Sequence, residues 1–528
     1  MRRMIGVAYA LALAGPAVAQ QPAAAPAGAP AAQPRPIPEV VKSAQDSKFT
    51  VPTCDIDDGH FKVKSGRTYL KSAIESPSNR DRILNDAERV LRESIDKDGQ
   101  GSVAGSWYWL GRVALYKGDI ATADSALDKA EALAPACKAD IDNARRPTWA
   151  GLTQAGIELY NAKKPAEAKP YLLAAASFYA AEPQAFLALG NIALDENDQA
   201  GAQEMFGKAY AAAGTPEQQG VRASAAAQVG SMFANRGQPD SAIVYLTEAV
   251  AKADTVSQKA LLRQSLFNLA LMEQRVGKHQ DAVAHISRAV AMDPADVDAK
   301  RGLAQMLRAA GMADSARKVE ESLLTAAGGD PAAGAVGEMS ASALLDVGVA
   351  AFREKDYARA ADAFEKALVA DPLNHDALYN LANSYVGLSQ WQKLGATAER
   401  LLALEPYNDF ANKAAVKAHQ QLKHSDAANA AATKLLAMPV TVEATSFSAD
   451  GGSASWQATA TGREAMTASG AAKPPAPITL VVEFLDAKGG VVTSQDVAVN
   501  ALKAGETQSL SASAQGAGIN SWRYRVKS

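Results

Sequence analysis

Cysteine, aromatic side chains and an excess of charge of either sign are all scarce in this sequence of 528 residues. Aromatic residues make up 6% of the chain, and the formal net charge is only −3. A nearly neutral chain gives no electrostatic reason to expect binding to nucleic acid or to an anionic membrane surface. The length exceeds what one hydrophobic core supports, so we expect several domains or a repeat array.

Sequence motifs for catalysis are also missing. The chain has no Gly-x-Ser-x-Gly nucleophile elbow and no phosphate loop ending in Gly-Lys-Ser/Thr. None of the histidines stands in a His-Glu-x-x-His zinc motif, and we expect His279 and His285 to be solvated residues at helix ends. The histidines are His60, His279, His285, His375, His419 and His424. We therefore predict no enzyme, no cofactor and no metal; an enzyme of a new type is the alternative.

One acidic run resembles the opening of a calcium-binding EF-hand loop. It extends from Asp96 to Gly101, but the twelfth position, which needs a bidentate glutamate, is Trp107. Asp55, Asp57 and Asp58 are also close together, with the wrong spacing. We expect solvated turns at both places.

The N-terminus has the features of a secretory leader, residues 1–19. Arg2 and Arg3 precede a short apolar stretch, and small residues lead to a predicted cleavage between Ala19 and Gln20. The alternative is a membrane anchor, but the stretch is shorter than the roughly 20 residues needed to span a bilayer. No later segment is apolar enough to span a membrane. We expect a periplasmic or secreted protein.

The two cysteines, Cys54 and Cys137, are the only ones in the chain. In an oxidising compartment an even pair predicts a disulfide. A bond closing so long a loop would stabilise the fold by up to roughly 4–5 kcal/mol in the chain-entropy model. The alternative is two buried free thiols.

Changes in composition divide the rest of the chain. Residues 20–47 are rich in Ala and Pro and predict a disordered linker. Residues 48–327 and 338–437 show the periodicity of amphipathic helices, and residues 328–337 form a Gly/Ala loop between them. Residues 439–528 change to the period-two alternation of β-strands.

The helical regions repeat themselves. In one copy a small residue in mid-helix, Gly348, is followed by Ala360, Phe364 and Pro372, and the next copy ends at Pro406. We expect Gly348 and Ala360 to let the two helices of a pair approach each other. Phe364 would fill the gap between neighbouring pairs, and Pro372 would stop the second helix because proline lacks an N–H.

This pattern resembles the tetratricopeptide repeat, a helix-turn-helix unit of about 34 residues. The mid-helix positions of the frame are Gly66, Gly111, Gly156, Gly190, Gly230, Ala270, Ala304, Gly348, Ala382 and Val416. Glu320 departs from the pattern, since a large apolar residue is usual there. The resemblance implies a mainly α fold, an α-solenoid of stacked helix pairs. The alternative is an Ala-rich helical array of another repeat type.

The C-terminal region, residues 439–528, predicts a small β-sandwich of immunoglobulin-like type. Six strands are expected, with a hairpin turn at residues 486–490 and alternating inward and outward residues around Trp522. The strands are Val440–Phe447, Ser453–Thr461, Ile478–Leu485, Val491–Val499, Thr507–Ala514 and Ile519–Val526.

The resemblance also implies a binding surface, because the first helix of each pair lines a concave groove in tetratricopeptide proteins. The matching positions are Tyr108, Arg112, Leu187, Asn191, Phe267, Leu271, Arg301, Gln305, Leu345, Val349, Tyr379 and Asn383. Family members that grip a chain terminus line the groove with Lys and Asn. Here only Arg112 and Arg301 supply cations, in separate repeats, so we predict no such clamp.

Together these features predict an exported scaffold that binds partner proteins or extended peptides in the groove, with no nucleic-acid partner and no membrane span. The alternative is a cell-envelope anchor, in which the β domain binds glycan or peptidoglycan and the repeats act as a spacer. Exposure of Trp456 and Trp522 would favour that alternative. The oligomeric state and the identity of the partner do not follow from these features.

Overall fold

The structure is a computed structural model that describes residues 34–56, 59–254, 256–327, 338–450, 452–467 and 469–527. The predicted leader, the cleavage site between Ala19 and Gln20, the first part of the linker and the loop at 328–337 lie outside the described residues. The chain divides into two compact units, Met1–Met292 and Asp293–Ser528, and each is described by itself.

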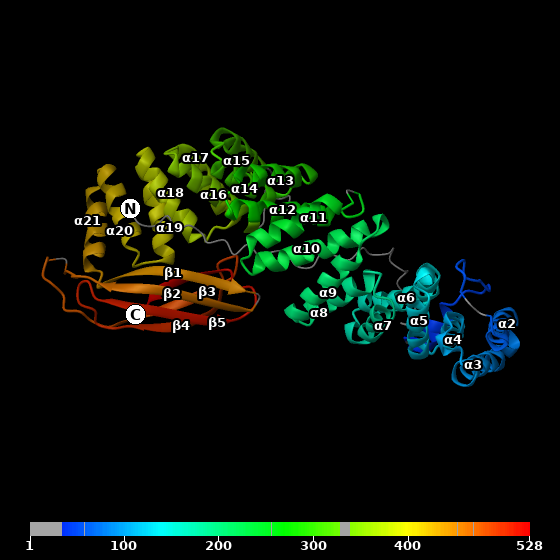
Figure 1. Cartoon of the computed structure of the whole chain (residues 1–528). Helices are drawn as coiled ribbons and strands as arrows, with labels where there is room; N and C mark the ends of the chain where they lie inside the picture. Colours follow the sequence, from blue (N-terminus) through cyan, green and yellow to red (C-terminus); the bar gives the residue numbers. More distant parts are fainter. Residues whose placement is uncertain are drawn as a thin grey trace. The chain divides into compact units, whose positions relative to one another are not determined.

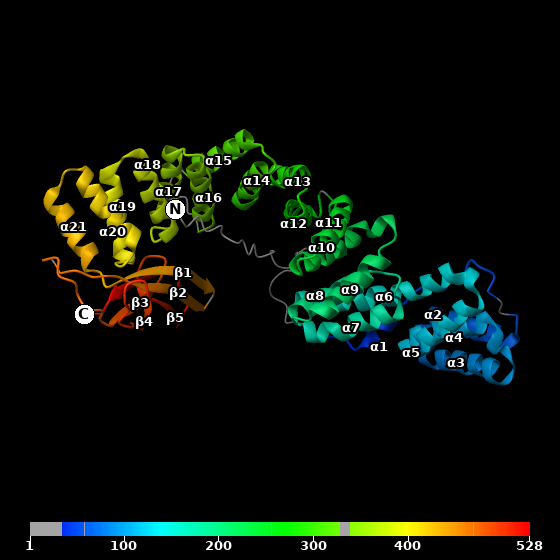
Figure 2. The same cartoon turned by 60° about the vertical axis from the view of Figure 1, so that its left-hand side comes forward.

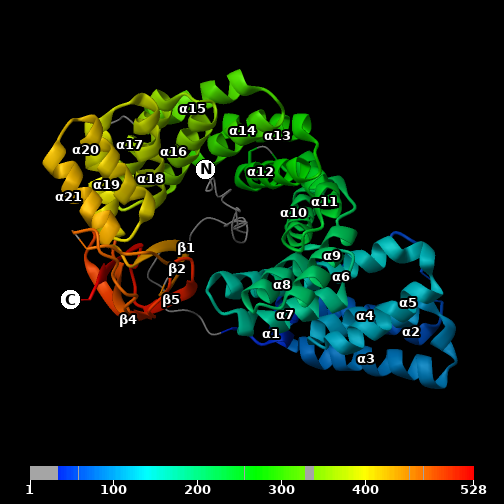
Figure 3. The same ribbon diagram turned by 90° about the vertical axis from the view of Figure 1, so that its left-hand side faces the viewer.

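Unit 1 begins with a short helix, α1 (Ile37–Ser43), and continues as six antiparallel helix pairs (Figure 3). We call the first helix of each pair the A helix and the second the B helix. The pairs are α2 (Phe61–Glu75) with α3 (Arg80–Lys97), α4 (Ala104–Lys117) with α5 (Ile120–Leu133), α6 (Lys138–Asn161) with α7 (Pro165–Phe178), α8 (Gln184–Asp195) with α9 (Gln199–Ala212), α10 (Gln219–Asn235) with α11 (Pro239–Lys252), and α12 (Lys259–Arg275) with α13 (His279–Met292).

Unit 2 continues the same architecture with four described helix pairs (Figure 1). They are α14 (Val297–Ala309) with α15 (Ala313–Ala327), α16 (Glu338–Arg353) with α17 (Tyr357–Ala370), α18 (His375–Leu388) with α19 (Trp391–Leu404), and α20 (Asp409–Gln421) with α21 (Ser425–Ala437). The predicted fold class, a helical solenoid followed by a small β domain, is confirmed.

The mid-helix glycines are the points at which paired helices touch. A Cβ atom added to Gly111 would lie 2.8 Å from Leu127 Cγ, and one added to Gly348 would lie 2.6 Å from Phe364 Cδ1. Gly66, Gly156, Gly190 and Gly230 are equally close to a large residue of their B helices. Phe364 thus packs directly over the glycine of its own pair, whereas we had placed it between neighbouring pairs. Close approach explains why the repeat frame needs small residues at these positions.

The helix ends are set by local side chains. The Asp119 carboxylate accepts a hydrogen bond from the Thr122 N–H (3.1 Å) and begins α5, and Asp356 begins α17 in the same way through Arg359 N–H. Gly118, with φ of 78°, adopts the left-handed conformation that ends α4. A sharp turn between the A and B helices of a pair follows from these residues.

The C-terminal region forms two three-stranded antiparallel sheets, with strand orders β1-β2-β5 and β4-β3-β6. The strands are β1 (Val440–Asp450), β2 (Ser453–Gly462), β3 (Ile478–Leu485), β4 (Val491–Val499), β5 (Thr507–Gln515) and β6 (Ser521–Val526). The described strands follow the order of strands A, B and E of an immunoglobulin domain on one sheet, and of C′, C and F on the other. Trp456, Leu480, Phe484 and Tyr524 fill the core between the sheets.

The β domain packs against the last helix pairs of unit 2 (Figures 1 and 2). The buried Tyr524 hydroxyl accepts a hydrogen bond from the Tyr407 N–H (3.0 Å), and burial raises its pKa well above the ordinary value. His375 stacks on Trp522 with ring centroids 4.1 Å apart. Arg463 forms an ion pair with Asp409 (2.6 Å). These contacts fix the β domain to the loops that precede α18 and α20.

Two expectations about the chain need correction. Residues 20–47 were expected to be disordered, but α1 begins at Ile37, and its Val40 and Val41 are buried because α1 packs on helices α4 and α6. His285 was expected to be solvated, but it lies 2.8 Å from the buried carboxylate of Glu273. Burial raises the pKa of Glu273 more than its hydrogen bond to His285 lowers it.

Candidate functional site

The predicted groove residues all lie on A helices, and we call the surface that the A helices form in each unit the A face. In unit 1, Leu187 and Asn191 on α8 and Phe267 and Leu271 on α12 are all partly buried. Leu187 and Leu271 pack at the margin of the apolar core. Leu187 and Leu271 therefore combine a core contact with a surface that remains open to solvent.

Tyr108 and Arg112 differ from the other predicted groove residues because both are buried. What covers them is a part of the chain itself, residues 45–56, which we call the crossing segment. It leads from α1 toward α2 and lies across α4. The Arg112 guanidinium donates to the Thr50 carbonyl oxygen (2.5 Å) and to Thr50 Oγ1 (3.3 Å). Tyr116, one turn further along α4, donates to the Asp46 carbonyl oxygen (2.8 Å).

Aromatic rings complete this contact. The Phe49 ring stacks on the buried Trp109 ring at a centroid distance of 5.8 Å. The Arg112 guanidinium carbon lies 5.7 Å from the Phe49 centroid and 5.9 Å from that of Tyr108. Burial raises the pKa of the Tyr108 and Tyr116 hydroxyls, so both remain neutral hydrogen-bond donors.

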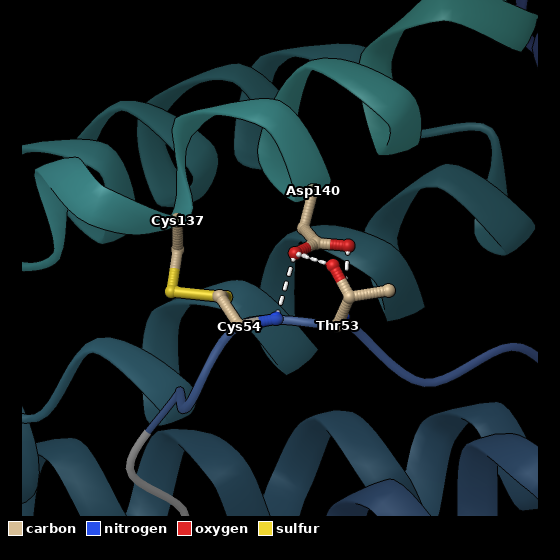
Figure 4. Close-up of a disulfide and its surroundings, with 4 residues drawn as sticks. All are labelled: Thr53, Cys54, Cys137 and Asp140. Carbon is tan, nitrogen blue, oxygen red and sulfur yellow. Dashed lines mark hydrogen bonds between the residues drawn. A yellow bond between two sulfur atoms is a disulfide. The ribbon is translucent and has the colours of Figure 1, made fainter.

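The far end of the crossing segment is bound by Asp140 on α6 (Figure 4). Its carboxylate accepts hydrogen bonds from the Thr53 N–H (3.0 Å), the Thr53 hydroxyl (3.0 Å) and the Cys54 N–H (2.9 Å). Burial alone would raise the pKa of Asp140, but the hydrogen bonds from the Thr53 and Cys54 N–H groups and the Thr53 hydroxyl together outweigh it and lower the pKa. Beside this contact Cys54 and Cys137 form a disulfide, with Cα atoms 5.4 Å apart.

In unit 2 the A face is built from α14, α16, α18 and α20. Leu345, Val349, Tyr379 and Asn383 are all partly exposed there. The Tyr379 ring contacts that of Phe410 at 4.3 Å between centroids. Sequence reasoning missed Phe410, which occupies the second position of α20, one turn before the positions that the repeat frame points to.

The two predicted cations of the groove are both committed to contacts within the chain. Arg112 binds Thr50, and Arg301 pairs with Asp346 of α16. Gln305 also donates to Asp346 Oδ2 (3.1 Å). Each of these side chains therefore contacts another part of the chain in the structure.

Other candidate chemistry has ordinary structural explanations. Asp98, in the run that resembles an EF-hand, forms an ion pair with Lys62 (2.7 Å). Asp57 and Asp58 lie outside the described residues. Within the part of the chain that the structure describes, no group of three or more His, Cys, Asp or Glu residues is placed to hold a metal ion. Likewise, among those residues no helix combines the length and apolar character needed to cross a bilayer.

The two tryptophans that would favour glycan binding, Trp456 and Trp522, are buried. Trp456 lies in the sandwich core, and Trp522 is covered by His375. On the outer side of the same sheet Glu483 pairs with Arg523 (2.6 Å) and Arg525 (2.9 Å). Neither tryptophan can therefore serve as an exposed stacking platform for a sugar.

Comparison with known proteins agrees with the helical architecture. Sequence profiles of the tetratricopeptide repeat match residues 104–137, 267–331, 332–375 and 345–409. No curated protein matches the chain.

One similar solved structure is pilF of Pseudomonas aeruginosa, with 19% identity over 45% of this chain and 99% of that one and a TM-score of 0.33. A second is YrrB, described as a TPR protein with an unusual peptide-binding site, with 15% identity over 43% of this chain and 89% of that one and a TM-score of 0.27. Another is the C-terminal part of a TPR repeat-containing protein of Cytophaga hutchinsonii (17% identity, 47% and 93%, TM-score 0.35). At these values the structures are similar only in their general type of fold. The profile matches show tetratricopeptide repeats at residues 104–137 and 267–409.

Proposed function

We propose that the protein is an exported scaffold that binds extended segments of partner proteins on its A face, without catalytic turnover. One observation supports this most strongly. The A helices α4 and α6 already hold an extended segment, which belongs to the chain itself, through Arg112, Trp109 and Asp140. A surface that binds one extended segment has the chemistry to bind another.

Unit 2 offers a second surface of the same type. Its A face carries aliphatic, aromatic and amide side chains, among them Val349, Tyr379 and Asn383, which are partly exposed. Apolar side chains provide binding energy and amides pair with a peptide backbone, so this composition suits an extended or helical partner segment. We place the partner site of unit 2 here.

Export is supported by two features of the chain. Residues 1–19 have the basic, apolar and small-residue regions of a secretory leader. A disulfide persists in an oxidising compartment, and the pairing of Cys54 with Cys137 is consistent with one. N-terminal sequencing of the mature protein checks this part of the proposal. It should begin at Gln20 and be recovered from the periplasm or medium; an intact Met1 in the cytoplasm would contradict it.

The binding function is tested by photo-crosslinking in the native cells. A photoreactive amino acid is placed at Tyr379 on the A face, and in a control chain at Val369, which is exposed on the B helix α17. We expect discrete protein adducts from position 379, and their loss when Val349 on the adjacent A helix is changed to Asp. Equal adducts from both positions, or adducts insensitive to Val349→Asp, would contradict the proposal.

A further inference from the structure

We propose that the A face of α4 and α6 is a specific peptide site whose ligand is the crossing segment, and that the site accepts the same peptide from outside when the Cys54–Cys137 disulfide is open. The proposal deepens the proposed function, on which it rests, by naming the chemistry of one ligand. That chemistry is an extended peptide with an aromatic residue, followed by threonine at the next position and again three residues later.

The buried polar groups of this site form hydrogen bonds to the backbone of the crossing segment, as a peptide-binding site requires. Arg112 and Asp140 are 6% and 9% exposed, carry opposite charge, and have no direct hydrogen bond to each other among the described contacts. Instead Arg112 faces a backbone carbonyl, and Asp140 faces two backbone N–H groups. Burial of a charge is costly unless hydrogen bonds compensate, and here the crossing segment supplies them. Without the segment both charges would lie on an open A face.

The contacts also show which side chains are recognised. The Phe49 ring lies against Trp109 and Arg112, and the hydroxyls of Thr50 and Thr53 bond to Arg112 and Asp140. The side chain of Val51, which lies between Thr50 and Thr53 in the sequence, is 53% exposed, so this residue only separates the two threonines along the backbone. Recognition therefore depends on Phe49, Thr50 and Thr53, while position 51 is free to vary.

Two attachments hold the segment in place. At its start, α1 buries Val40 and Val41, and Ala44 lies so close to α6 that a Cβ added to Gly151 would be 3.0 Å from its Cβ. At its end the disulfide joins it to Cys137. A dithiol opens this bond by transferring two electrons and two protons, which gives two thiols while the dithiol becomes a disulfide. Afterwards the segment is still part of the backbone between α1 and α2, but only non-covalent contacts hold it on α4 and α6, and these can exchange.

The experiment uses the full chain with a protease recognition sequence in place of Asp57-Asp58, so that cleavage leaves residues 20–56 attached only by the disulfide and by contacts. A fluorescent peptide of residues 35–56, with Cys54→Ser, is added, and anisotropy follows its exchange for the cleaved segment. We expect exchange in dithiothreitol and at least tenfold less in the oxidised chain, while circular dichroism shows that the helices remain.

Peptide variants separate recognition from a purely structural role and do not affect folding of the repeats. We expect Phe49→Ala and Thr53→Ala peptides to bind at least tenfold more weakly, and a Val51→Ala peptide to bind as the parent does. In the protein, Asp140→Asn should weaken binding similarly. Loss of the helices on reduction, equal binding of all peptides, or no exchange would each overturn the proposal. Because these readouts involve only unit 1, they are independent of the crosslinks expected at Tyr379.

Discussion

The substitution Glu320→Gln, which removes one negative charge and keeps the shape of the side chain, should strongly destabilise unit 2. Glu320 lies on α15, where the repeat frame expects a large apolar residue, and it is only 2% exposed. Its carboxylate accepts two hydrogen bonds from Arg308 of α14 (2.8 and 2.9 Å) and pairs with Arg359 of α17. A buried carboxylate in this position is tolerated because two guanidinium groups from neighbouring helices neutralise it.

The magnitude follows from burial. Removing one partner from a buried ion pair costs about 3–5 kcal/mol. Arg308 and Arg359 retain partial contact with solvent, and glutamine keeps one acceptor, so we expect a loss near the lower end, about 3 kcal/mol. For a unit of this size about 1 kcal/mol lowers Tm by about 2–4 °C, so the transition of unit 2 should fall by about 6–12 °C.

Scanning calorimetry measures the transition, and hydrogen exchange assigns it to α14, α15 and α17. Glu321→Gln is the matched control, because Glu321 is adjacent and exposed, and it should change stability by less than about 0.5 kcal/mol. Replacing Glu320, Arg308 and Arg359 together by leucine should be far less harmful than Glu320→Gln, since no buried charge of the cluster is then left unpaired and Glu354, which also pairs with Arg308, is partly exposed and keeps Arg317 as a partner. If Glu320→Gln shifts the transition no more than Glu321→Gln, the buried cluster does not stabilise the unit as argued.

Three further outcomes are expected. Gly348→Ala should lower the free energy of unfolding by about 1–3 kcal/mol, measured by thermal unfolding, because the added Cβ meets the buried Phe364 ring. The control Gly395→Ala should be neutral or stabilising, since its Cβ would make an ordinary contact at 3.5 Å. Equal effects of the two substitutions would contradict close packing as the cause. Cys54→Ser should lower the stability of oxidised unit 1 by about 4 kcal/mol and leave the reduced protein nearly unchanged, as judged by urea unfolding. The lowered pKa of Asp140 means that its contribution is fully present above about pH 4 and is lost as the pH falls through the folded value. Peptide binding to unit 1 should therefore weaken in acid, and Asp140→Asn should remove that dependence.

The sequence by itself determined the repeat units. Spaced small residues such as Gly111 and Gly348, the prolines after the B helices, and the alternation around Trp522 are local patterns, and local patterns encode helices, turns and strands directly. That is why the six predicted strands match the observed strands to within three residues at each end, and why the predicted mid-helix positions fall inside the A helices. It is also why Glu320 stood out as a departure from the frame.

Tertiary structure decided which distant side chains meet. Nothing local marks Thr53 as a partner of Asp140, His375 as a partner of Trp522, or Glu320 as a partner of Arg359, because each pair forms only after separate elements stack at a given angle. The repeat frame predicted Tyr108 and Arg112 as groove residues, but it carried no information about the segment that covers them. Periodicity specifies the face that a residue occupies, and only packing of the folded chain specifies what lies against that face.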